Sequence, residues 1–145
     1  MKSTLAFAIG ALTALGFAGS AGAATPGLYS GNFPLTVTHS AHSNFKYCLT
    51  LTDDGSEGFP HSGQASLFLE SFNESFLGEF QLIDHTLVTT IEEPGSSGSN
   101  AGAVFVAPAG SGIIGNGAYD QVLGGGVFDS GVLVFGKKGG CSPPH

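Results

Sequence analysis

The chain has 145 residues, a formal net charge of −7 and no arginine. Four lysines stand against eleven acidic residues. Nucleic-acid binding needs cationic groups that displace counterions from phosphates, so this balance excludes it, and it excludes attraction to anionic membrane surfaces for the same reason.

The first 24 residues have the pattern of a cleavable secretory signal peptide. Met1-Lys2 supplies a positive start, and Leu5 to Phe17 is an apolar run too short to span a bilayer. Ala21-Gly22-Ala23 is the small-x-small pattern of a cleavage site, so we expect cleavage after Ala23 or Ala24. The pattern predicts export to the periplasm or the extracellular space, with no membrane insertion afterwards.

Residues 25–145 are expected to form one β-rich domain. Without Lys2 this part carries three lysines against eleven acidic residues. It also carries the two cysteines of the chain, Cys48 and Cys141, and an even pair in a small exported domain predicts a disulfide. A redox-active pair would be closely spaced in sequence, as in Cys-x-x-Cys, and these two are far apart.

The first predicted strands lie on either side of a histidine-containing loop. Phe33, Leu35 and Val37 alternate with threonines, and Pro34 within this run indicates an edge strand or a strand start. Asn44 to Thr52 alternates more clearly, with Phe45, Tyr47, Leu49 and Leu51 facing one way. Cys48 then lies on the outer face, and a disulfide from there brings the C-terminal tail across the outside of the sheet.

The middle of the chain contains one ambiguous segment between two expected turns. Asp53-Asp54-Gly55 is typical of a turn, and Asp84-His85 suits a two-residue hairpin turn between strands over 79–83 and 86–92. Between these turns, residues 65–83 carry a phenylalanine every fourth position, which leaves a helix open as an alternative. Gly78 and the neighbouring hairpin favour two strands joined at Phe72 to Ser75.

The last third of the chain predicts three more strands after a Gly/Ser loop over 94–102. These are Ala103 to Ala107, Gly117 to Leu123 and Val127 to Phe135, the last apolar on both faces and expected to be buried on both. The fold class is therefore all-β: an antiparallel meander of about eight strands, in a small closed or nearly closed barrel. A two-sheet β-sandwich is the alternative.

Gly110-Ser111-Gly112-Ile113-Ile114-Gly115 spells the dinucleotide-binding pattern G-x-G-x-x-G. That pattern binds pyrophosphate at the start of a following helix, whereas Asn116-Gly117 opposes a helix. We therefore interpret the segment as a glycine-rich turn or bulge and expect no cofactor.

Phe128-Asp129-Ser130-Gly131 resembles the Asp-Ser/Thr-Gly motif of aspartic proteases, and Ile113 to Asn116 is similar to the second signature of their retroviral-type members. In that family the aspartate motif comes first, whereas here the order is reversed. The alternative interpretation is a strand in which Gly131 marks a bulge. Asp129 lies among apolar residues, so a core position would require its charge to be paired or hydrogen-bonded.

Metal-ligating candidates are scattered along the chain. His39 and His42, completed by His61 or His85, offer imidazoles for zinc, and the acidic run 53–58 offers oxygens for calcium. The histidines fall in an expected loop without a neighbouring carboxylate, and the acidic run lacks the alternating ligands of an EF-hand. We expect surface histidines, a solvated turn and no metal site.

The expected function is non-catalytic, because no acid, base and nucleophile fall into an interpretable arrangement. We expect an exported β-barrel that binds a small molecule in its interior, with Tyr119, Asp120 and Asp129 as the candidate ligand-binding residues. The alternative is a protein-binding module, either an inhibitor or a surface or matrix component.

Overall fold

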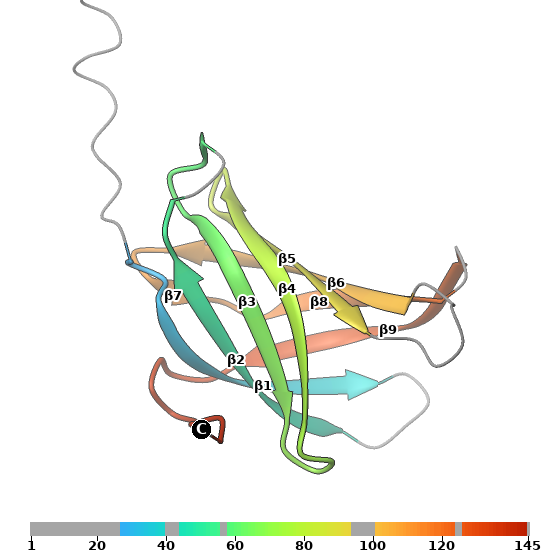
Figure 1. Cartoon of the computed structure of the whole chain (residues 1–145). Coiled ribbons are helices and arrows are strands. Elements are labelled where there is room, and N and C mark those ends of the chain that lie inside the picture. The colour runs from blue at the N-terminus through green and yellow to red at the C-terminus, as the bar shows by residue number, and fades with distance from the viewer. Residues whose placement is uncertain (1–26, 40–43, 56–57, 94–100, 124–125, 145) are drawn as a thin grey trace, which may run out of the picture.

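The computed structural model describes residues 27–39, 44–55, 58–93, 101–123 and 126–144. The expected signal peptide, His42 and most of the Gly/Ser loop lie outside these ranges. Within them, no helix is long and apolar enough to cross a membrane. The described chain consists of strands that curl around a common axis (Figure 1).

Eight antiparallel strands close into a barrel, and a ninth, short strand lies at one end. Strand order around the barrel is β1-β2-β3-β4-β5-β6-β8-β9, and β9 pairs with β1 to complete the circle. The two-residue strand β7 pairs with the end of β6. The strands are β1 (Gly31–His39), β2 (Phe45–Asp53), β3 (Ser62–Leu69), β4 (Glu74–Ile83), β5 (Thr86–Glu93), β6 (Ala101–Gly110), β7 (Ile113–Ile114), β8 (Gly117–Leu123) and β9 (Gly126–Phe135). The antiparallel barrel prediction is confirmed, and the sandwich alternative is wrong.

Strict alternation along the strands fills the interior of the barrel. Successive side chains on a strand point to opposite faces, so every second residue enters the core. The core contains bulky side chains from every strand of the barrel, among them Phe33, Leu49, Leu67, Phe80 and Leu133. Burial of these side chains is the main favourable term in the stability of the fold.

The two middle hairpins have the turns that the sequence indicates. Asp84 and His85 have φ angles of 46° and 63°, so both central residues of the β4–β5 turn are left-handed. The segment that left a helix open forms β3 and β4 instead, joined through Asn73 at a φ of 55°. The two-strand prediction for residues 65–83 is confirmed, and the helix alternative is wrong.

Two expectations about strand position are corrected by barrel closure. Strand β1 is not an edge strand, because it pairs with both β2 and β9. Pro34 is tolerated because its pairing with β9 has ended there, and its carbonyl accepts the Gly136 amide at 2.7 Å. Nor is β9 buried on both faces, since Val132 and Val134 are 52% and 44% exposed on the outside of a single-layered barrel.

The C-terminal tail is fixed to the outside of the barrel by the Cys48–Cys141 disulfide. Cys48 alternates with the core-facing Leu49 and is not part of the interior cluster, yet it is fully buried. Its cross-strand partner on β3, Phe68, is also buried. Both the predicted disulfide and the outward position of Cys48 are confirmed, and an intramolecular disulfide is compatible with an oxidising location.

Candidate functional site at the barrel mouth

One end of the barrel is filled by a side chain from outside the strands. At the end where β2 finishes and β8 begins, Tyr29 from the segment before β1 is inserted into the core and is 1% exposed. We call this the plugged end. The opposite end, where β1 finishes at His39 and β9 begins at Gly126, is called the mouth.

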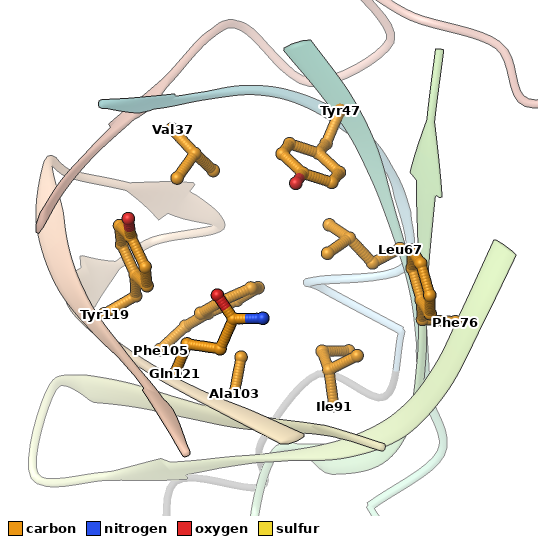
Figure 2. Close-up of a pocket in the computed structure, with 9 residues that line it drawn as sticks. All are labelled: Val37, Tyr47, Leu67, Phe76, Ile91, Ala103, Phe105, Tyr119 and Gln121. Atoms are coloured by element: carbon orange, nitrogen blue, oxygen red, sulfur yellow. The ribbon is translucent and has the colours of Figure 1, made fainter. Parts of the chain in front are cut away.

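A small cavity lies inside the barrel toward the mouth, with a volume of about 30 Å³. Figure 2 shows the nine side chains arranged around it, and seven of the eight barrel strands contribute them. They are mostly apolar, with two phenols and one amide: Val37, Tyr47, Leu67, Phe76, Ile91, Ala103, Phe105, Tyr119 and Gln121. A space of this size holds one or two water molecules, or one compact group of a larger molecule.

Two of the three predicted site residues meet at this end of the barrel. The Tyr119 hydroxyl donates a hydrogen bond of 3.0 Å to the Asp129 carboxylate, and both side chains are buried. Asp120 follows Tyr119 on β8 and therefore points outward, where it is exposed. Alternation on one strand prevents consecutive residues from sharing a pocket, so the structure does not bring Asp120 to the other two.

Tyr119 is held neutral by its surroundings. Burial raises the pKa of its hydroxyl well above the ordinary value of 10.0, and the hydrogen bond and negative charge of Asp129 raise it further, with a contribution from Tyr47. The Tyr119 ring meets Phe105 edge to face, with centroids 6.4 Å apart. A neutral phenol bonded to a carboxylate can donate and accept hydrogen bonds, but it is not poised to act as a base.

The glycine at the end of the segment Asp129-Ser130-Gly131 is explained by close packing. It lies opposite Tyr119 in the β8–β9 pairing. A Cβ atom at Gly131 would lie 2.8 Å from the Tyr119 ring and 2.0 Å from the carbonyl oxygen of Thr38. The glycine therefore gives the Tyr119 ring its place beside Asp129, which is a packing role. No bulge is recorded at Gly131 itself, since the register shift of this pair falls at Gln121/Val122.

The segment with the dinucleotide-binding pattern is a tight turn. Strand β6 ends at Gly110 and β7 follows, with Ser111 and Gly112 between them at φ angles of 52° and 76°. A strand, not a helix, follows the turn, so the geometry that places pyrophosphate at a helix start is missing in this segment. The predicted glycine-rich turn is confirmed.

A buried His–Asp pair at the plugged end was not anticipated from the sequence. The His61 Nδ1 and Asp53 Oδ2 atoms are 2.8 Å apart, and the same oxygen accepts the backbone N–H of Tyr29 at 3.0 Å. The Tyr29 and His61 rings also meet edge to face at 5.1 Å. Asp53 and His61 thus fix the plug, which gives them a structural role.

The expected turn at Asp53 is corrected by this cluster. Asp53 is the last residue of β2 and is 6% exposed. The sequence did contain a signal for this position. Tyr47, Leu49 and Leu51 point inward, and because every second residue of a strand faces the same side, Asp53 is the next inward residue. The residue type suggested a solvated turn, whereas the strand periodicity indicated the interior.

The histidine candidates do not converge on a metal in the part of the chain that is described. His61 is engaged with Asp53, and His85 is exposed in the β4–β5 turn. Within the described ranges no three His, Cys, Asp or Glu side chains group together in a way that could hold a metal ion. His42 lies outside those ranges, as do Ser56 and Glu57 of the acidic run.

Comparison with known proteins assigns no family. No protein-family model, no curated protein and no solved structure matches the chain.

Proposed function

We propose that the protein is a non-catalytic, exported β-barrel that binds a small molecule at its mouth. The observation that carries this proposal is the cavity toward the mouth, where polar groups are placed on an otherwise apolar lining. In Figure 2 the Tyr47 hydroxyl and the Gln121 amide point into the same space as the apolar side chains. Such a combination of apolar wall and few polar groups is typical of small-molecule sites.

The dimensions and charge of the mouth define the ligand class. A volume of about 30 Å³ admits one compact group, so the remainder of the ligand would lie at the rim. The Asp129 carboxylate behind Tyr119 favours a group that carries N–H or O–H donors and disfavours an anion. The ligand is therefore neutral or cationic, with a hydroxyl, amine or amide at its inserted end.

Ligand screening by thermal shift tests this proposal. A panel of neutral and cationic small molecules is added to the oxidised protein, and binding to the native state raises its melting temperature by mass action. Asp129→Asn replaces the buried carboxylate with an amide. Asp120→Asn is the matched control, because it makes the same replacement on the outer face of β8. We expect the shift to shrink in Asp129→Asn and to persist in Asp120→Asn.

Two results would contradict the mouth as the binding site. One is the absence of any stabilising compound across the panel. The other is an equal loss of the shift in the Asp129 and Asp120 variants, because the outward Asp120 side chain does not reach the interior.

Protein binding is the second candidate, and the exposed outer face of the barrel favours it. Val106, Ala118 and Val132 are laterally paired neighbours on β6, β8 and β9, and the two valines are 43% and 52% exposed. Val134 and the β1 threonines Thr36 and Thr38 continue this face. Exposed apolar patches of this kind commonly mark interaction surfaces.

The partner that fits this outer face is a second copy of the chain. The protein is strongly acidic, and the six side chains just named carry no charge, so two copies could meet there without placing carboxylates together. Sedimentation velocity measures the association. Val132→Lys should abolish it and Leu77→Lys, on exposed β4, should not; a monomer at all concentrations, or equal effects of the two changes, rejects this candidate.

A further inference from the structure

A second and larger pocket lies at the plugged end, outside the barrel interior. It has a volume of about 460 Å³ and is bounded by β1, β7 and the end of β9 with the tail that follows. We call it the basic groove. Its side chains are Phe33, Ile113, Ile114, Phe135, Lys137 and Lys138, with glycines 112 and 136 between them.

The floor and rim of the basic groove are apolar. Phe33 and Ile114 are buried beneath it, and Phe135 is half-buried. Ile113 stands at its rim and is 71% exposed, which is unusual for a large aliphatic side chain without a partner surface. The Ser111-Gly112 turn positions Ile113, because it carries the chain from β6 directly into β7.

The groove also collects positive charge in an acidic protein. Of the three lysines in the described residues, Lys137 and Lys138 line this groove, and no acidic residue lines it. Lys138 is anchored: its aliphatic stem lies against Gly31, where an added Cβ would be 2.5 Å from Cε. Its Nζ donates to the Leu28 carbonyl at 3.2 Å, and an ammonium has further protons to donate.

We propose that the basic groove binds an alkyl carboxylate. The alkyl chain would lie over Ile113 and Phe135, and the carboxylate would accept hydrogen bonds from the ammonium groups of Lys137 and Lys138. The volume is within the usual range for small-molecule sites, whereas the cavity at the mouth is far smaller. Two ammonium groups beside an apolar floor complement one anionic head joined to one apolar tail.

This site differs from the mouth in place and in ligand charge. At the mouth the Asp129 carboxylate lies behind the lining residue Tyr119, whereas two lysines line the basic groove. The two proposals therefore fail or succeed separately. An anion suited to the basic groove is disfavoured at the mouth, and a cation suited to the mouth is disfavoured at the basic groove.

Titration calorimetry with decanoate, kept below its micelle concentration, tests the basic groove. Decyltrimethylammonium is the matched ligand of opposite charge. We expect saturable binding of decanoate, weakened at least tenfold by Lys137→Gln and by Ile113→Asp, and little binding of the cation. Both substitutions are at exposed positions, so each variant should fold like the parent. Lys46→Gln is the control, because Lys46 is exposed on β2 away from the groove.

Amide chemical shifts locate the bound decanoate independently. Binding in the basic groove should move the resonances of Gly112 and Gly136 and leave Gly131, near the mouth, unchanged. The proposal is overturned by equal binding of the cation, by an equal effect of Lys46→Gln and Lys137→Gln, or by shifts centred on Gly131. Absence of any saturable decanoate binding overturns it as well, and it leaves the mouth proposal untouched.

Discussion

The disulfide between Cys48 and Cys141 should supply a large part of the stability of this barrel. The two cysteines are 93 positions apart, so the bridge closes a long loop in the unfolded chain. For a loop of this length the chain-entropy model gives about 4.7 kcal/mol at 25 °C. Domains of this size have free energies of unfolding of about 5–15 kcal/mol, so the loss would be a substantial fraction of the total.

Urea unfolding of the variant Cys48→Ala/Cys141→Ala measures this contribution. With a slope of about 2 kcal/mol per molar urea, a loss of about 4.7 kcal/mol lowers the unfolding midpoint by roughly 2 M. The slope itself should change little if the folded state is preserved. A midpoint within about 0.5 M of the parent protein, a loss near 1 kcal/mol, would refute the assignment of this stability to loop closure.

A single-cysteine variant separates loop closure from the covering of the outer face. In Cys141→Ser the Cys48 thiol remains on β2, where the parent structure buries it completely. If the disulfide holds the tail in place, its loss uncovers Cys48, and the thiol should react with a small disulfide reagent at nearly the rate of the unfolded protein. A rate lowered by several orders of magnitude would show that the tail remains docked without the covalent bond.

Three further predictions concern single side chains of the barrel. Thr89 is fully buried, and its hydroxyl has no hydrogen-bond partner among the described residues. Thr89→Val should therefore raise the free energy of unfolding by about 1 kcal/mol in urea titrations, while Thr90→Val on the exposed face should not. Gly131→Ala places a Cβ 2.0 Å from a β1 carbonyl oxygen and should cost about 2–3 kcal/mol, whereas Gly110→Ala, with nothing within 4 Å, should cost little; equal costs would contradict the close packing. The pKa of Tyr119 is raised in the folded state, so its contribution to stability is fully present below pH 10. Above that pH the Tyr119 hydroxyl loses its proton in the unfolded chain but keeps it in the folded chain. Stability should therefore fall by about 1.4 kcal/mol per pH unit above pH 10, and Tyr119→Phe should remove this slope in unfolding measured at several alkaline pH values.

Periodicity within single strands made most of the fold predictable from the sequence. The alternation around Cys48 placed it outside the barrel, and Asp84-His85 matched a turn that requires left-handed residues. Both signals are local, because side-chain direction and turn geometry depend on neighbouring residues only. The same local reasoning, that a polar residue lies within an apolar strand, selected Tyr119, Asp120 and Asp129, but the hydrogen bond between Tyr119 and Asp129 comes from the structure alone.

Relations between distant strands could not be predicted in the same way. The edge or strand-start position expected for Pro34 and the double burial expected for 127–135 both depend on which strands are neighbours and on what covers the outside of the sheet. Asp53 was missed because its residue type is common in turns, although its position in the alternation put it inside. Asp120 was selected as a polar residue on a strand with apolar neighbours, but it directly follows Tyr119, and consecutive side chains of a strand lie on opposite faces.

The barrel can close only when β9 is available to pair with β1, and this requirement affects how the protein folds. These strands come from opposite ends of the described chain, so the pairing that completes the barrel has a very high contact order. Until β9 is available, β1 and the growing sheet have unpaired edges, which are prone to associate with other chains. Folding should therefore be slow and nearly all-or-none. When the chain emerges gradually, as it does during synthesis, the unpaired edges must be kept from other chains until β9 is available.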